Sequence, residues 1–510
     1  MVTRECRRRR KCRSKHQVDE PQINEPQIND AASTAGEATL SSLAQTVRSR
    51  LRPTKAPLRP ALPPGGHDDL EAMEKADRAA LIKRAAILGP IFTGVAHGEF
   101  YVVVMGLQRG RRLLLEHTED LLSVTLEIES LVPKGLLRQM RGVDHLDYRR
   151  PLVRAAKGTD PTLESAMLER IARHHLSEYT AAGDMSPQAL MATTSAIATS
   201  MLIGLFFGVE PGPNPGADLA QSLFDGFYEL GPHGMAWNMG PRQDAAFALL
   251  RDLLRQALTE RRNGTVPFDN RCVLAQVADE HEGDVDETML GNLIFIAEMG
   301  RADVKNQIRW LTRYAAMNPD LLDRIASETV NKAVGQRSVA EAFAFEQLRS
   351  DQSERLTRIA ERDIVFDGFL IPAGSYIRVC LWEAHQDSEA FPEPDTFKPD
   401  RFLGNMPSND QYAPFGADHH QCPFGGATVR LASAYLRALA TTYRPTLIND
   451  GPPVRGPYHW EPSRRLAVDI AIVSDLPLVD PSNSASPNPS SNQSNIPSTH
   501  PSSNPSGDPL

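Results

Sequence analysis

The sequence predicts a mainly α-helical fold with small β-sheets. Most of the middle of the chain has apolar residues at helical spacing, and residues 284–317 form the longest such run, roughly nine turns at 3.6 residues each. Segments rich in β-branched and aromatic residues, such as 99–105, are bounded by glycines and occur only near the two ends of the fold. With 510 residues, the chain is long enough for one large domain of about 400 residues.

Both terminal segments lack the apolar pattern of a folded core. Residues 1–65 are rich in Pro and charge and include the basic run 7–11, and residues 479–510 are almost entirely Ser, Asn and Pro. We therefore expect two disordered ends around a folded domain at 66–478. The basic run is interpreted as part of a solvated tail, with a nuclear-localisation or nucleic-acid patch as the alternative.

Composition argues against several classes of function. The formal net charge of −9 and pI near 5.9 give no field that favours nucleic acid, so we expect no nucleic-acid partner. Five widely scattered cysteines indicate a reducing compartment, and the charged start is not followed by the apolar segment of a secretory signal. Residues 190–208 carry no charge but contain Thr and Ser, which favours a buried core helix over a membrane span. We expect a cytoplasmic protein without a stable span.

In chain order, the first predicted elements are a polar helix at 68–83, the strand at 99–105 and a helix at 107–117. The next helical region places His145 and Arg149 on one face at i, i+4. Such a pair can bind paired carboxylates, and the alternative is a surface His-Asp-Arg cluster. Helices at 247–262, 271–281 and 284–317 follow, and the Met- and Trp-containing segment 232–240 is a candidate wall of an apolar pocket.

Residues 414–426, PFGADHHQCPFGG, concentrate the chemistry. Cys422 lies between two glycine-containing turns, and a helical run begins near Thr428. Backbone N–H groups and a helix N-terminus stabilise a thiolate, which can then serve as a soft axial ligand to iron. The alternative is a buried, inert cysteine beside a turn.

This loop resembles the cytochrome P450 cysteine loop, F-G-x-G-x-[RH]-x-C-x-G. Phe415, His420 and Cys422 fall in register with that pattern, as does the glycine after Phe415. Asp418 replaces the second glycine, and Phe424 stands where a glycine is expected after the cysteine, as if one residue had been inserted. The resemblance implies haem b as cofactor, Cys422 as the metal ligand, and Phe415 and His420 as cofactor contacts.

Other motifs of the same family follow in the family's order. They are an E-x-x-R at Glu346 and Arg349, the I-P-A-G at 371–374 and the F-K-P-D-R-F that contains Arg401. The resemblance implies that Glu346, Arg349 and Arg401 form a buried ion network. It also implies that Arg358 contacts one haem propionate and that His145 and Arg149 contact a propionate as well.

The long helix departs from the family pattern A-G-x-[DE]-T-[TS]. Placing Ala297 on the first alanine puts Gly300 at the acid and Arg301 at the threonine, so the usual proton relay is absent. In one interpretation Glu298, Asp303, a water or a substrate hydroxyl replaces the relay. In the other, Arg301 anchors a carboxylate and peroxide supplies the oxygen, unless its long side chain leaves the active site. Glu298, Gly300 and Arg301 are therefore the candidate catalytic residues.

The predicted function is a haem-thiolate monooxygenase that oxidises an apolar small molecule, in a specialised biosynthetic pathway. Electrons would come from NAD(P)H through a separate ferredoxin or flavoprotein reductase, because the sequence has no Gly-rich dinucleotide fingerprint. One alternative is a peroxide-dependent peroxygenase or hydroperoxide isomerase on the same fold. Another is a non-catalytic haem- or ligand-binding protein.

Overall fold

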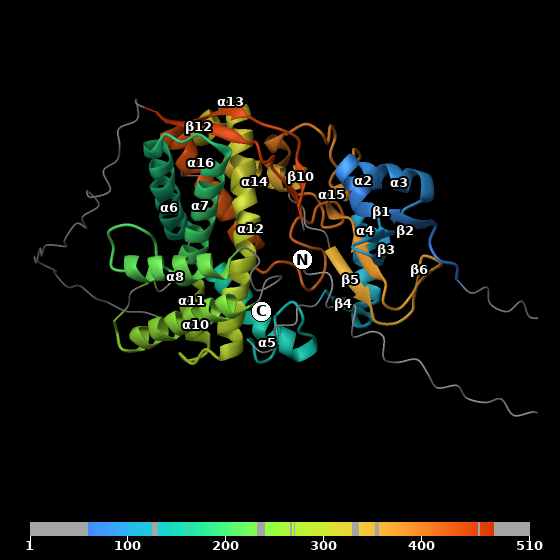
Figure 1. Ribbon diagram of the computed structural model, residues 1–510, viewed down its shortest axis with the longest axis horizontal. Helices are drawn as coiled ribbons and strands as arrows, with labels where there is room; N and C mark the ends of the chain where they lie inside the picture. Colours follow the sequence, from blue (N-terminus) through green and yellow to red (C-terminus); the bar gives the residue numbers. More distant parts are fainter. Residues whose placement is uncertain are drawn as a thin grey trace, which may run out of the picture. The chain divides into compact units, whose positions relative to one another are not determined.

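The computed structural model describes residues 60–124, 131–159, 161–231, 240–265, 268–269, 271–328, 336–351, 356–456 and 459–473 (Figure 1). These residues belong to one compact unit that begins at Pro60. The N-terminal segment 1–59, most of the candidate pocket segment 232–240 and the tail 479–510 lie outside the described residues. Residues 60–65 contact the fold, since the carbonyl oxygens of Ala61 and Pro64 accept hydrogen bonds from Leu370 and Thr93. The described unit thus begins earlier than the predicted boundary at 66.

Helices dominate the unit, which confirms the mainly α prediction. Their bounds are α2 Leu70–Ala76, α3 Ala80–Leu88, α4 Leu107–Glu116, α5 Gly142–Gly158, α6 Pro161–Ala182, α7 Pro187–Phe207, α8 Ala217–Leu230, α10 Pro241–Arg262, α11 Val273–Glu280, α12 Glu287–Met317, α13 Pro319–Ser327, α14 Val339–Ser350, α15 Leu381–Ala384 and α16 Gly425–Thr442. Short 3₁₀ turns are η1 Thr118–Asp120 and η2 Pro399–Phe402. The single helix predicted at 68–83 is two helices, which the extended residue Asp77 separates.

The strands are β1 Gly65–Asp69, β2 Ile91–Ala96, β3 Glu99–Val104, β4 Leu121–Ser123, β5 Leu356–Ala360, β6 Ile364–Phe366, β7 Phe369–Ile371, β8 Tyr376–Val379, β9 Tyr443–Asn449, β10 Val454–Arg455, β11 Trp460–Glu461 and β12 Ala467–Ile472. Six of them form one mixed sheet in the order β1-β2-β3-β8-β5-β4.

This sheet joins the two ends of the fold. Strand β3 pairs in parallel with β8, with Val102 opposite Ile377 and Val104 opposite Val379. All four side chains are fully buried. The pairing is favourable because the β-branched side chains of each strand shield those of the other strand from water. Small β-sheets were predicted near both ends of the fold, and the structure adds that strands from the two ends pair within one sheet. Pairing between distant segments leaves no local signal in the sequence.

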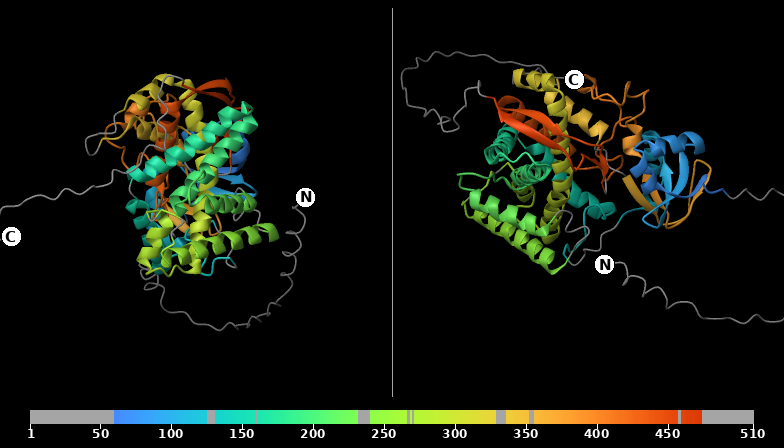
Figure 2. Two further views of the ribbon diagram at one scale, coloured as in Figure 1. Left: turned by 90° about the vertical axis from the view of Figure 1, so that its left-hand side faces the viewer. Right: turned by 45° about the horizontal axis from the view of Figure 1, so that its top comes forward.

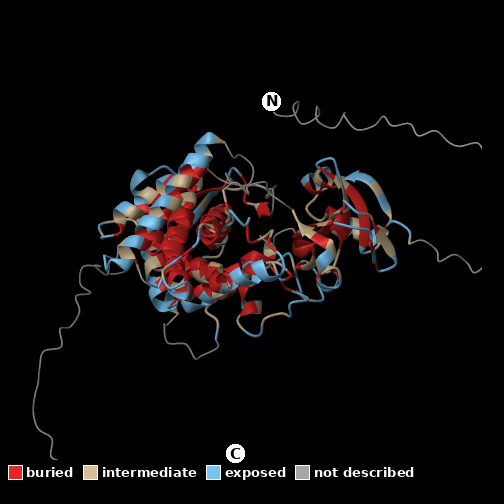
Figure 3. Ribbon diagram, turned by 90° about the horizontal axis from the view of Figure 1, so that it is seen from below, coloured by how far each residue is buried: buried red, intermediate tan, exposed pale blue. Residues whose placement is uncertain are grey.

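Helix α12 runs through the helical part of the unit, with α7 and α16 packed beside it (Figures 1 and 2). Asp286 caps its first turn by accepting the Met289 N–H at 2.7 Å, and Pro319 begins the next helix. Most of its residues are buried, and the exposed residues of the neighbouring helices face outward (Figure 3).

Helix α7, Pro187–Phe207, contains nearly all of the uncharged stretch 190–208. It is long and apolar enough to cross a membrane, yet 72% of its most apolar window is buried against the rest of the protein. Ser186 caps its start, and Gly208 ends it in a left-handed conformation with φ of 69°. The contacts of α7 with α12 and α6 are those of a core helix.

Candidate functional site

The loop that carries Cys422 is closed by its own backbone. The Cys422 N–H donates to the Phe415 carbonyl at 2.8 Å, and the Gln421 N–H donates to the Asp418 carbonyl at 3.0 Å. Gly416 has a φ of +100°, a conformation that side chains disfavour. This closed turn presents the Cys422 thiol at the surface, three residues before the start of α16.

The extra residue Phe424 fits into the core. Its side chain is buried, and its ring centroid lies 4.7 Å from that of Phe206 on α7. The next residue, Gly425, lies under the Phe415 ring, because a Cβ there would meet ring atoms at 2.7 Å. The glycine that the loop needs is thus Gly425, and the insertion adds an aromatic side chain between the loop and α7.

A cavity of about 270 Å³ separates this loop from α12. Cys422, Phe415 and Phe424 line it on the loop side. The α12 side is made by residues spaced three and four apart, which is one face of a helix. They are Phe295, Ile296, Met299, Gly300, Asp303, Val304 and Gln307.

Of the three predicted catalytic residues, Gly300 lines the cavity. Arg301 turns toward α7 and α8, where it donates to Thr199 Oγ1 at 3.1 Å and to the Phe227 carbonyl. Its guanidinium also lies over the Phe227 ring, 5.7 Å from the centroid, and burial lowers its pKa. Neither Arg301 nor the fully buried Glu298 is among the described residues that line the cavity. Anchoring of a carboxylate by Arg301 therefore has no support from its contacts.

Asp303 reaches the cavity, and it does so beside a residue that sequence reasoning missed. His459, from the segment before β11, places Nδ1 at 3.3 Å from Asp303 Oδ1. Its Nε2 lies 3.2 Å from the side-chain nitrogen of Asn306. Both Asp303 and His459 line the cavity. No motif surrounds His459, and more than a hundred residues separate it from α12, so the sequence carries no signal for this contact.

Two arginines lie at the loop side of the cavity. The first is Arg358 of β5, a predicted cofactor contact, which forms a buried ion pair with Asp418. Burial raises the pKa of Asp418, but the charge and hydrogen bond of Arg358 outweigh this, and the pKa ends below its ordinary value. The second is Arg138, which sequence reasoning missed because no motif surrounds it. The residue that replaces the family's glycine thus holds one of the two cations.

His145 and Arg149 of α5 support the loop from behind. The Arg149 guanidinium donates to the Gln421 carbonyl at 2.7 Å, and the buried His145 ring lies 4.4 Å from that of His420. Burial, followed by the charge of Arg149, lowers the pKa of His145 to about 4. Burial, followed by the charge of His419, lowers the pKa of His420 to about 3. His145 Nε2 has no hydrogen-bond partner among the described residues. His420 lines the cavity, whereas His145 is not among the described residues that line it.

The predicted ion network exists. Arg349 donates to both carboxylate oxygens of Glu346, at 2.8 and 2.9 Å, and Arg401 donates to one of them at 3.2 Å. Glu346 and Arg349 are fully buried. Because Glu346 also accepts the Lys398 N–H at 2.8 Å, the network fixes the segment that precedes the cysteine loop.

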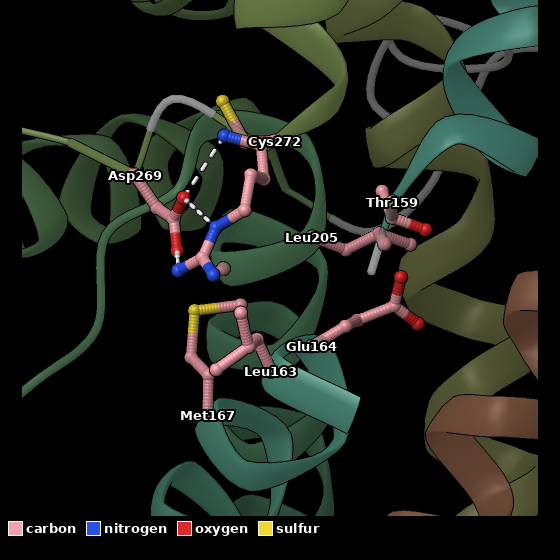
Figure 4. Close-up of a pocket in the computed structure, with 9 residues that line it drawn as sticks. Thr159, Leu163, Glu164, Met167, Leu205, Asp269 and Cys272 are labelled. Atoms are coloured by element: carbon pink, nitrogen blue, oxygen red, sulfur yellow. Dashed lines mark hydrogen bonds and ion pairs between the residues drawn. The ribbon is translucent and has the colours of Figure 1, made fainter. Parts of the chain in front are cut away.

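A second, smaller cavity lies between α6, α7 and the start of α11, with a volume of about 20 Å³ (Figure 4). Its walls include Cys272, whose pKa burial raises to about 12, so this thiol is inert at neutral pH. Asp269 there pairs with Arg271. A space of this size holds about one water, so it is no site for an organic ligand.

The donor set of the larger cavity fits haem b. Cys422 offers an accessible thiol, Arg138 and Arg358 offer cations for carboxylates, and aromatic side chains supply apolar walls. The three features meet in one cavity, although they come from the cysteine loop, β5, α7, α12 and the segment before α5 that carries Arg138.

Comparisons with known proteins agree with this geometry. Residues 322–425 match the family model described as Cytochrome P450. The chain is 27% identical over 198 residues to ent-kaurenoic acid oxidase 2 of Arabidopsis thaliana, a match that covers 36% of this chain and 40% of that protein. It is 25% identical over 327 residues to cytochrome P450 85A1 of Oryza sativa subsp. japonica, covering 58% of this chain and 68% of the relative.

Solved structures show the same fold. A retinoic acid-bound cyanobacterial CYP120A1 superposes with a TM-score of 0.61 at 20% identity, covering 81% of this chain and 99% of that one. In the Arabidopsis relative, by contrast, the matched part is less than half of the protein's length.

Proposed function

The chain belongs to the cytochrome P450 family, and on that premise we propose that it is a haem-thiolate monooxygenase that oxidises an apolar small molecule. One observation carries the proposal: an accessible cysteine thiol and one face of the long helix α12 line the same largely apolar cavity. In the further proposal, the enzyme is cytoplasmic, acts in a specialised biosynthetic pathway and takes electrons from NAD(P)H through a separate ferredoxin or flavoprotein reductase.

Haem b, when bound, supplies the redox-active iron at which an oxidant is activated. Cys422 would hold the iron as a thiolate, and the start of α16 lies close by to stabilise the negative charge. Arg138 and Arg358 would pair with the haem carboxylates. Phe206 and Phe295 would exclude water from the part of the cavity in which the substrate would lie.

The test is the absorption spectrum of the reduced protein under carbon monoxide. We expect a long-wavelength Soret band in the wild type and its loss in Cys422→Ala. Cys272→Ala is the matched control, because that thiol is buried away from the cavity. Absence of haem, or the same band in Cys422→Ala, would contradict the proposal and favour a ligand-binding protein.

A peroxide-dependent enzyme is the second candidate, because the cavity face of α12 has no hydroxyl side chain among the residues described. The position of Arg301 does not support the version in which that arginine anchors a carboxylate. Turnover with hydrogen peroxide alone, without turnover with reductase partners, would select this candidate.

A further inference from the structure

Asp303 places a carboxylate in the wall of the largely apolar cavity. Its side chain is 53% exposed, although it lies at the middle of α12, and it lines the same cavity as Cys422. Of the cavity residues next to it on α12, Met299, Gly300 and Val304 are apolar or lack a side chain, and Gln307 is polar but uncharged. About half of this carboxylate is open to solvent, and His459 lies beside it at ion-pair distance. Lys305 is also near enough for its charge to interact with that of Asp303.

The contacts of Asn306 determine the protonation of His459. Asn306 Oδ1 accepts an N–H of Arg309 at 3.4 Å, so the Asn306 amide nitrogen is the atom that faces His459. The amide therefore donates to His459 Nε2, and the imidazole proton lies on Nδ1, 3.3 Å from the Asp303 carboxylate. The Nδ1 side of this imidazole therefore faces the carboxylate of Asp303.

This arrangement is a poor path for protons. A relay needs groups that accept a proton on one side and release it on the other. His459 ends at the side-chain amide of Asn306, which does not exchange its protons in this way. His459 is also buried, with a side chain 6% exposed. The contacts of His459 with Asn306 and Asp303 therefore serve to orient the Asp303 carboxylate, and they do not relay protons to it.

We propose that Asp303, oriented by His459 and Asn306, anchors the cationic nitrogen of an otherwise apolar substrate. A carboxylate and nearby aromatic faces are the groups that proteins use to bind quaternary and other ammonium ions. Phe206 and Phe295 supply such faces in this cavity. Arg138 and Arg358 lie at its loop side, and Arg358 is already paired with Asp418. This inference rests on the proposed function, since it names the substrate class of the same cavity.

The test compares two ligands of the same shape. One is 3-phenylpropyl-trimethylammonium, and the other replaces its charged group with an uncharged tert-butyl group. The quaternary nitrogen has no lone pair, so it does not coordinate iron. Isothermal titration calorimetry of the haem-loaded full chain should show that the wild type binds the cation at least about tenfold more tightly than the neutral ligand.

Three variants locate the effect. Asp303→Asn keeps the shape and removes the charge, so the preference should fall to about twofold or less while affinity for the neutral ligand stays unchanged. His459→Phe should reduce the preference about threefold through loss of the orienting donor. Asp252→Asn, on the surface of α10 with a side chain 66% exposed, is the charge-matched control and should keep the full preference.

The outcomes separate this inference from the proposed function. A wild type that binds both ligands equally, or an Asp303→Asn variant that keeps the preference, overturns the anchor. If Asp303→Asn does not fold, the ligand pair on the wild type still decides. A thiolate-haem spectrum without a preference for the cation would support the monooxygenase proposal and reject Asp303 as the anchor. A preference that depends on Asp303, without that spectrum, would support Asp303 as the anchor and reject the monooxygenase proposal.

Discussion

The two walls of the cavity acquire their geometry in different ways. On the loop side, a backbone hydrogen bond between Cys422 and Phe415 closes eight residues into one turn, so the order of residues determines which side chain is presented. On the α12 side, a shift of one residue turns a side chain by about 100°. Packing against α7 and α8 decides that Gly300 faces the cavity and Arg301 does not. The sequence of a closed loop therefore determines by itself which side chain faces the cavity. In a helix, the elements that pack against it determine which side chain does so.

The largest effect should come from outside both walls. Glu346→Ala leaves Arg349 buried without its carboxylate, and we expect the free energy of unfolding to fall by roughly 3–5 kcal/mol in urea denaturation. Haem should then be lost more easily, because the segment before the cysteine loop loses its anchor. Glu229→Ala, which removes an exposed pair with Arg242, should change stability by less than about 1 kcal/mol. Equal effects would mean that the loop geometry is purely local.

Asp418→Gly restores the residue that the family pattern has on the loop side. We expect a loss of about 3 kcal/mol in the haem-free protein, because Arg358 then stays buried without its carboxylate. Arg358→Leu in the same background should recover part of the loss, since the unpaired charge is removed. No loss in Asp418→Gly would show that the loop tolerates either residue and that Arg358 finds another partner.

Substitutions at neighbouring positions of α12 test the helix side directly. Gly300→Val puts a branched side chain into the cavity and should weaken ligand binding by at least about tenfold, measured by calorimetry. Arg301→Gln changes a side chain that points toward Phe227, so ligand affinity should change by less than about twofold. A reversed order of effects would mean that α12 presents another face.

The smallest effect should be a change in the pH dependence of stability. The pKa of His145 is about 4 in the folded protein and near 6.5 when unfolded, so the unfolded chain binds more protons between these values. Stability should therefore decline as the pH falls from 6.5 toward 4, and the decline should be shallower in His145→Phe. Urea denaturation at several pH values measures this slope. An unchanged slope would mean that other groups titrate.

What the sequence predicts about the site follows the same division. Some parts of the site could be predicted because they belong to motifs with short spacings that follow one another in the family's order. These are the ion network of Glu346, Arg349 and Arg401 and the position of Cys422. Arg138 and His459 could not, because tertiary packing alone brings them to the cavity. Arg301 could be placed on the correct helix but not on the correct face.

The fold shows the same limit. Helices from α4 to α16 have local periodicity and were mostly predicted, with boundaries that differ by a few residues. The parallel pairing of β3 with β8 was missed, since Tyr101 and its partner Tyr376 belong to segments with no common pattern.

That pairing also sets an order of events during synthesis. Residues opposite each other in β3 and β8 are separated by most of the folded chain, and a ribosome that adds about 5–20 residues per second needs on the order of tens of seconds to cover that interval. Through this time the hairpin of β2 and β3 has one edge without its neighbour, which is a template for association with other chains. The open edge of β3 should therefore persist until β8, Tyr376–Val379, has emerged.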